Sequence, residues 1–176
     1  SLGKWLETEP QVICLTHRRS LGSSISNRLG LAWRNDLDNA GGLWFSPEGK
    51  TWQGTPPRLC SCIDSLLAIP LEAFEGAVLV LDEVEQLLHH LLGSATIKQR
   101  GLVWQRFLQV VALVRQVVAL DADLSDDTIR LMQKARRLHG ASDALQLITN
   151  HQAPKPWQVH WYEQAKPDAC QQALIE

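Results

Sequence analysis

Short apolar runs alternate along this chain with longer segments in which apolar residues recur at helical spacing. Runs rich in Val, Leu and Ile predict strands that are buried on both faces of a parallel sheet, and the longer segments predict amphipathic helices. The predicted strands span residues 11–16, 59–62, 77–82, 116–121 and 145–149, with a further candidate at 158–162. The predicted helices span residues 2–8, 20–29, 84–92, 97–115, 125–138 and 168–175. This alternation indicates an α/β fold with one mainly parallel sheet and helices on both faces.

The stretch 30–58 interrupts the alternation, because it is rich in Gly, Pro, Asp and Trp and lacks helical periodicity. Within it, residues 43–52 predict a hairpin in which Gly49 takes the left-handed turn position. We therefore expect a single domain over residues 1–176 that carries an irregular insert at 30–58.

Composition changes this picture in three respects. The net charge of −2 excludes a globally basic surface, so any contact with nucleic acid would come from local patches. The four scattered cysteines predict buried free thiols in a reducing cytoplasm, and the chain has no signal peptide and no apolar run of membrane-spanning length. We thus expect a cytoplasmic protein with no membrane partner, and a chain that starts at Ser1 without an initiator Met reads as a fragment of a longer polypeptide.

Two adjacent carboxylates, Asp82 and Glu83, directly follow the apolar run that begins at Ala77. Charges at the end of a buried strand are favourable at the carboxyl edge of a parallel sheet, where ligands bind. There an Asp can hold Mg²⁺ through its water shell, and a Glu can orient or deprotonate an attacking water. The alternative is that the two acids only cap the next helix.

A second apolar strand ends in the same way, at Asp121-Ala122-Asp123. The helical segment between the two strands has about the length of a right-handed crossover, so both acidic turns should lie at one edge of the sheet. A compact basic turn, His17-Arg18-Arg19, follows the strand 11–16. It can bind phosphates without reading a base sequence, or it can be an ordinary solvated turn.

Four segments, in order, resemble the first RecA-like domain of superfamily 2 helicases, and most closely that of replication initiators: the herpesvirus origin-binding protein and the cyanobacterial plasmid replication proteins. Residues 12–21 resemble motif Ia, residues 62–66 an element near motif Ib, residues 82–85 motif II (the Walker B box) and residues 118–125 motif III.

The resemblance implies an ATP- and Mg²⁺-dependent motor that binds DNA, either a single strand or a replication origin, next to a second RecA-like domain of the same polypeptide. In that family Asp82 would hold the metal and Glu83 would polarise the attacking water, while Asp121 and Asp123 would sense the γ-phosphate. The DNA contacts would come from Thr16, His17, Arg18, Arg19, Asp64 and Ser65.

The chain departs from this family in one respect, because it has no Gly-rich Walker A loop that ends in Gly-Lys-Ser/Thr. Ser1 can be the last residue of such a loop, in which case the rest lies upstream and the fragment by itself is inactive. A second hypothesis is a degenerate, nucleotide-free module that binds DNA or a partner. A third is a Toprim-type Mg²⁺-dependent nuclease or primase, since Asp121-Ala122-Asp123 fits its Asp-x-Asp spacing.

Overall fold

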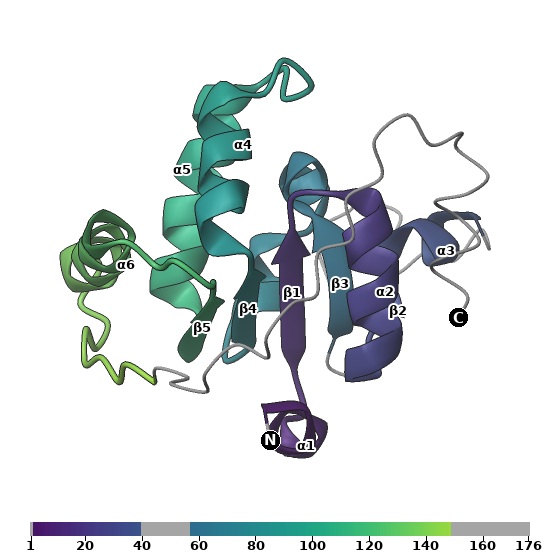
Figure 1. The fold of residues 1–176 in the computed structure, drawn as a ribbon, viewed down its shortest axis with the longest axis horizontal. Helices are drawn as coiled ribbons and strands as arrows, with labels where there is room; N and C mark the ends of the chain where they lie inside the picture. The colour runs from purple at the N-terminus through teal and green to yellow at the C-terminus, as the bar shows by residue number, and fades with distance from the viewer. Residues whose placement is uncertain (1, 40–56, 149–176) are drawn as a thin grey trace, which may run out of the picture. The chain divides into compact units, whose positions relative to one another are not determined.

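The structure, a computed structural model, describes residues 2–39 and 57–148. Its centre is a five-stranded, all-parallel sheet in the order β2-β3-β1-β4-β5 (Figure 1). The strands are β1 (Val12–Thr16), β2 (Ala32–Trp33), β3 (Arg58–Cys62), β4 (Val78–Asp82) and β5 (Gln116–Leu120). The predicted α/β class, with a parallel sheet and helices on both faces, is confirmed.

The strands are aligned so that they end at nearly the same level. Val12 of β1 pairs with Arg58 of β3 and with Val78 of β4, and Asp82 at the end of β4 pairs with Leu120 of β5. The residues that follow β1, β3, β4 and β5 therefore lie along one edge of the sheet, which we call the carboxylate edge.

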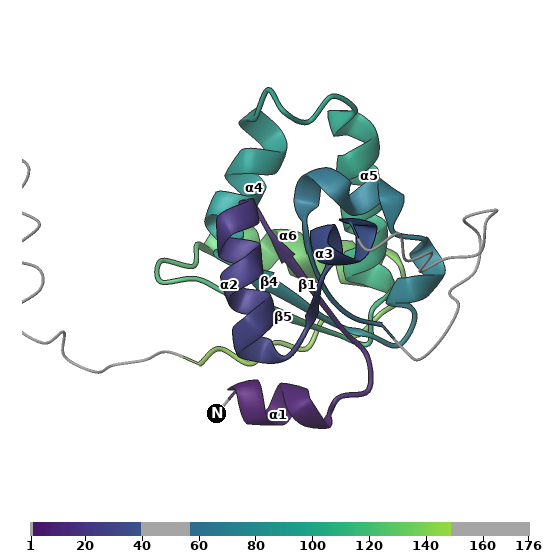
Figure 2. The same ribbon diagram turned by 90° about the vertical axis from the view of Figure 1, so that its right-hand side faces the viewer.

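Helices cover both faces of the sheet, and Figure 2 shows α2 and α5 on opposite sides of the strands. The α-helices are α1 (Leu2–Thr8), α2 (Arg19–Leu29), α3 (Arg34–Asn39), α4 (Val84–Gly93), α5 (Arg100–Leu113) and α6 (Asp126–Leu138). Two 3₁₀ segments, η1 (Ile63–Ala68) and η2 (Leu71–Phe74), connect β3 to β4. None of the helices described is both long and apolar enough to cross a membrane.

The core divides into two clusters, one on each face, because successive side chains of a strand point to opposite faces. On one face, Leu79 and Leu81 of β4 pack with Phe107 of α5. On the other, Val78 and Val80 of β4 belong to the cluster that contains Ile25 of α2. Strands β1 and β4 are thus buried on both faces, as their continuous apolar runs predict.

Helix α1 lies at the edge of the sheet where the strands begin, opposite the carboxylate edge (Figure 1). The guanidinium of Arg58, at the start of β3, donates hydrogen bonds to the carbonyls of Leu6 and Glu9. Arg115, just before β5, pairs with the Glu9 carboxylate. These contacts fix the end of α1 below the sheet.

Several predicted elements need correction or lie outside the description. The predicted strand at 145–149 is wrong over its described part, 145–148, which has no regular structure. Leu145 and Leu147 there are 55% and 61% exposed, so the alternating apolar residues do not form the buried face of a strand. The irregular insert begins with β2 and α3, which the sequence did not predict. The hairpin at 43–52, the strand at 158–162 and the helix at 168–175 lie outside the described residues.

A close approach between α2 and β2 provides a test of the packing. A methyl group added at Gly22 would lie 2.3 Å from Cζ3 and 2.4 Å from Cη2 of Trp33. Gly22→Ala should therefore lower the free energy of unfolding in urea by about 1–3 kcal/mol, the usual cost of overpacking. Gly101→Ala, in α5 and with no atom within 4 Å of the added carbon, is the matched control and should be neutral or stabilising. A Gly22→Ala chain as stable as the original would contradict the packing of α2 against Trp33.

Candidate functional site at the carboxylate edge

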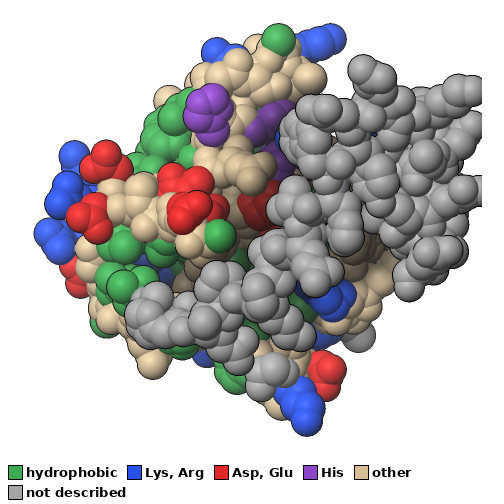
Figure 3. All heavy atoms as spheres, in the orientation of Figure 1, with side chains coloured by type: hydrophobic (Ala, Val, Ile, Leu, Met, Phe, Trp, Pro, Cys, Tyr) green, Lys and Arg blue, Asp and Glu red, His purple; other side chains and the backbone are tan. Residues whose placement is uncertain are grey.

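Four strands deliver polar residues to the carboxylate edge. His17 follows β1, Asp64 lies just after β3, Asp82 ends β4 and Asp121 follows β5. Figure 3 shows acidic side chains and histidines close together on the face that is viewed in Figure 1. The expectation that Asp82, Glu83, Asp121 and His17 lie along one edge is confirmed.

Asp82 is a half-buried carboxylate to which no residue of the described part of the chain donates a hydrogen bond. Burial raises the pKa of Asp82 above its usual value, and the neighbouring Glu83 raises it further. Ionisation is therefore less favourable here than for an ordinary Asp, and a bound cation would offset this cost. An unpartnered carboxylate of this kind fits a Mg²⁺ ion, which binds through one or two carboxylates and retains several waters.

Glu83 has an unusual backbone conformation, with φ of 50° and ψ of 58°. Among the described residues it is the only non-glycine with positive φ, a conformation that costs roughly 1–2 kcal/mol for an L-residue. It occupies the N-cap position of α4, yet its side chain makes no capping hydrogen bond. Instead, its side chain is 43% exposed, with Oε2 3.8 Å from Nδ1 of His17. The alternative that Asp82 and Glu83 only cap α4 is thus not supported.

Asp121 caps the start of α4, a role that the sequence offered as the alternative for Asp82 and Glu83. Its Oδ2 accepts a hydrogen bond from the backbone N–H of Glu85 in the first turn of α4, at 3.0 Å. Its Oδ1 accepts one from the N–H of Asp123, also at 3.0 Å. The turn after β5 is thereby tied to the start of the helix that follows β4.

Glu85, which the sequence did not single out, makes the reciprocal contact. Its Oε1 accepts a hydrogen bond from the backbone N–H of Ser125 at 2.8 Å, and Ser125 in turn caps α6 by accepting from the N–H of Thr128. Burial raises the pKa of Glu85, but the hydrogen bonds from Ser125 and Thr128 outweigh it and lower the pKa overall. An acid in the first turn of a predicted helix was the available signal.

The two acids after β5, Asp121 and Asp123, differ in their contacts. Asp123 is exposed, and its described contact is the backbone hydrogen bond to Asp121. The residues that the structure describes contain no group of three or more His, Cys, Asp or Glu side chains arranged to hold a metal ion. A metal at this edge would therefore be held by Asp82, with water and ligand oxygens completing its shell.

The expected nucleic-acid contacts divide into exposed and engaged residues. Arg18 and Arg19 are exposed. Thr16 is buried, and its hydroxyl closes the turn by donating to the carbonyl of Arg18 at 3.1 Å. The two oxygens of Asp64 accept from His90 at 2.7 Å and from Thr96 at 2.9 Å, so Asp64 anchors α4 and the following turn. The neighbouring Ser65 is half-buried.

His17 differs most from its expected place in a solvated basic turn. Its side chain is only 5% exposed, and neither ring nitrogen has a hydrogen-bond partner among the residues that the structure describes. Burial, reinforced by the charge of Arg18, lowers the pKa of His17 below its usual value.

Ser1 lies outside the described residues, and α1, which directly follows it, lies at the edge opposite the carboxylates (Figure 1). A seven-residue helix is about 10 Å long. The placement of α1 therefore lends no support to Ser1 as part of a phosphate-binding loop beside Asp82.

Cys14, Cys60 and Cys62 are free and buried, as expected.

Comparisons with known proteins assign no function to this edge. No family model matches the chain, and no solved structure matches it. An uncharacterized protein of the cyanobacterium Picosynechococcus sp. (strain PCC 7002) is 32% identical over 133 residues. The match covers 70% of this chain but only 12% of the length of that relative. The chain is thus similar to one part of a much longer protein.

The raised pKa of Asp82 predicts that this residue lowers the stability of the fold. A carboxyl whose folded pKa lies above its unfolded value destabilises the native state at higher pH, and this cost disappears below the unfolded pKa, about 3.8. Asp82→Asn should therefore raise the free energy of unfolding at pH 7, with the gain shrinking as the pH falls toward 4. Glu75→Gln, at an exposed carboxylate, should change stability by less than about 0.5 kcal/mol. Urea titrations at several pH values measure both, and a destabilised Asp82→Asn chain would contradict the assignment.

Proposed function

We propose that this chain is part of the ATP-hydrolysing motor domain of a DNA helicase or translocase that acts in replication initiation. The observation that carries this proposal is the pair Asp82–Glu83 at the end of a central, fully buried strand. The Asp82 carboxylate accepts no hydrogen bond from the described residues, so it is available to bind a cation, and its pKa is raised. Glu83 has a strained, left-handed backbone conformation. Strained residues and acids with raised pKa values concentrate at functional sites.

In the proposed reaction, Asp82 would hold Mg²⁺ through its water shell, and the bound ion would supply positive charge to offset that of the nucleotide phosphates. Glu83 accepts a proton from the water that attacks the γ-phosphate. Phosphoryl transfer depends mainly on positioning and charge neutralisation, so these two side chains and a phosphate-binding loop are the main requirements.

The described residues contain no such loop, and β5 offers a place for it. Among the described strands, β5 lies at one end of the sheet and pairs only with β4, and its four residues 117–120 are half-buried. A further strand that carried a phosphate-binding loop would pair with this free edge. Its loop would then emerge at the carboxylate edge, beside Asp121 and one strand away from Asp82.

The contact between Asp121 and Glu85 supports a coupling role for the turn after β5. This turn is hydrogen-bonded to the start of α4, whose N-cap is Glu83. A movement of the turn on nucleotide binding would therefore reach Glu83 through the backbone. The proposed partners are DNA and a second RecA-like domain of the same polypeptide, in the cytoplasm.

The two alternatives make different predictions. A nucleotide-free module would bind DNA or a protein partner without ATP-dependent change. A Toprim-type enzyme would need Asp121 and Asp123 to hold a metal together, and the hydrogen bond between them lends that arrangement no support.

Substitution at Glu83 tests the proposed hydrolysis. In the full-length protein, Glu83→Gln should leave nucleotide binding nearly intact and reduce ATP turnover by about 100-fold or more, because an amide cannot accept the proton of the attacking water. Asp82→Asn should also weaken Mg²⁺-dependent nucleotide binding. Steady-state hydrolysis and nucleotide titrations separate the two effects. Normal turnover by Glu83→Gln would exclude its role as the base, and no nucleotide binding by the unaltered protein would favour the nucleotide-free module.

Substitution of the basic turn tests the proposed contact with DNA. Arg18→Ala combined with Arg19→Ala should weaken binding to two unrelated single strands about equally. It should also reduce the slope of log affinity against log salt by roughly 0.7 per lost phosphate contact. Arg130→Ala with Lys134→Ala, two basic residues on α6, is the matched control. An unchanged slope in the Arg18/Arg19 variant would show that the turn does not contact DNA.

A further inference from the structure

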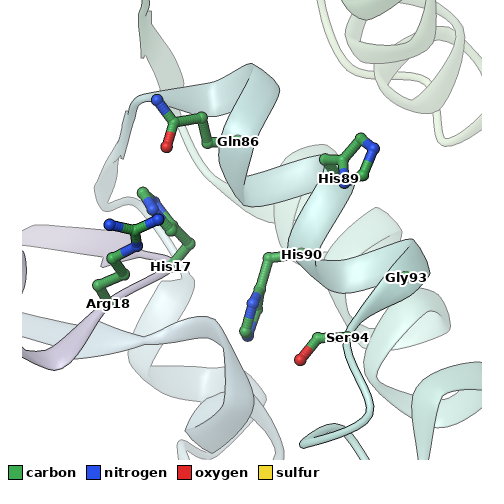
Figure 4. A pocket seen from close by; sticks show the side chains of 7 residues that line it. All are labelled: His17, Arg18, Gln86, His89, His90, Gly93 and Ser94. Atoms are coloured by element: carbon green, nitrogen blue, oxygen red, sulfur yellow. The ribbon is translucent and has the colours of Figure 1, made fainter.

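A groove runs between the turn from β1 to α2 and one face of α4 (Figure 4). It has a volume of about 420 Å³. His17 and Arg18 line one side, and the other side is formed by α4 and the residue that follows it, through Gln86, His89, His90, Gly93 and Ser94. From position 86 to position 94 a helix rises about 12 Å, so the groove suits an extended ligand better than a single small ion.

The side chains that line the groove favour an anion. The described residues of the lining offer a guanidinium, three imidazoles, an amide and a hydroxyl, and none of them is a carboxylate. The nearby Asp64 is already satisfied, because His90 and Thr96 donate to its two oxygens. This network fixes His90 at one side of the groove. The guanidinium of Arg18 is exposed and makes no hydrogen bond or ion pair with the residues that the structure describes.

His17 is the second observation that points to a ligand. A buried polar group without a hydrogen bond destabilises the folded state, so in a native protein it needs an explanation. Both nitrogens of His17 are in this state. The charged or titratable groups around the ring are Arg18 on its own turn, Glu83 and Asp82 at the end of β4, and His90 on α4. The ring centroids of His17 and His90 are 6.3 Å apart.

An anion in the groove would change the balance at His17. The pKa of His17 is lowered by burial and by the charge of Arg18. A phosphate paired with Arg18 would offset that charge and favour the imidazolium. Nδ1–H of the imidazolium would then face the Glu83 carboxylate, whose Oε2 lies 3.8 Å away.

We propose that this groove binds the phosphates of a single nucleic-acid strand and that His17 transmits its occupancy to Glu83. A strand phosphate held by Arg18 causes the His17 imidazole to take up a proton from solvent, and the imidazolium then pairs with the Glu83 carboxylate. His17 is thus a positioning residue for Glu83. The inference rests on the proposed function in naming a nucleic-acid strand as the source of the phosphate.

The test follows the protonation of His17 in the 176-residue chain, labelled with ¹⁵N-histidine and assigned with His17→Gln. An oligothymidylate should raise the pKa of His17, whereas an uncharged morpholino oligomer should not, and the exposed His139 should not respond to either. Arg18→Gln should weaken the response about tenfold, the loss of one charge-assisted hydrogen bond. Arg130→Gln, at an exposed arginine on α6, is the matched control and should leave the response unchanged.

The possible failures are distinguishable. If fluorescence anisotropy shows that the oligonucleotide binds and His17 does not respond, the inference is wrong and the proposed DNA contact stands. An unchanged response in Arg18→Gln also overturns it. If inorganic phosphate shifts His17 and the oligonucleotide does not, the assignment to a nucleic-acid strand is wrong. The measurement needs neither ATP nor Mg²⁺, so failure of the proposed hydrolysis leaves it valid.

Discussion

Pairing of parallel strands that are buried on both faces is the constraint on which this structure depends. Both faces of β1 and β4 pack against apolar side chains, so charged or polar side chains can reach solvent only at the ends of these strands. The aligned register of β1, β3, β4 and β5 then brings four such ends to one level. The concentration of Asp82, Glu83, Asp121 and His17 at one edge is thus a consequence of how the core is packed.

The same edge holds the residues that deviate most from an unstrained, fully satisfied structure. Glu83 has a left-handed backbone, Asp82 is an acid with a raised pKa, and the buried ring of His17 has no hydrogen-bond partner within the described ranges. At Gly30, by contrast, local preference and tertiary structure agree, because this glycine ends α2 in the left-handed conformation. Local strain is tolerated where the surrounding structure imposes it, and such places are often functional.

A second organising feature is the exchange of caps between the acidic turns. Asp121 accepts from the first turn of α4, and Glu85 of α4 accepts from the N-cap residue of α6. Each helix start thereby depends on a carboxylate from a different part of the chain, so α4, α6 and the turn after β5 are expected to move together. Glu83 is thus linked through the first turn of α4 to the turn after β5, because Asp121 accepts a hydrogen bond from Glu85. The Glu83 carboxylate also faces His17, which follows β1 and lines the groove.

What the sequence determined by itself was the set of central elements and the edge at which they end. Continuous Val and Leu runs identify β4 and β5, and helical spacing identifies α4, α5 and α6, because these signals are local and strong. The carboxylate edge followed from the parallel order of the strands. The prediction failed at 145–148, where apolar residues alternate but the structure buries none of them, and at β2, which is too short to have a pattern.

Only the tertiary structure decided what each site residue does. Asp82, Glu83 and Asp121 are similar acids at similar strand ends, yet their surroundings differ. Asp82 accepts no hydrogen bond from the described residues, Glu83 is strained and half-buried, and Asp121 caps a helix. His17 reads as part of a basic turn but is covered. These differences depend on which backbone N–H group or side chain from a distant segment lies within hydrogen-bond reach. Neither residue spacing nor local propensity encodes such long-range contacts, because they arise only when the sheet has assembled.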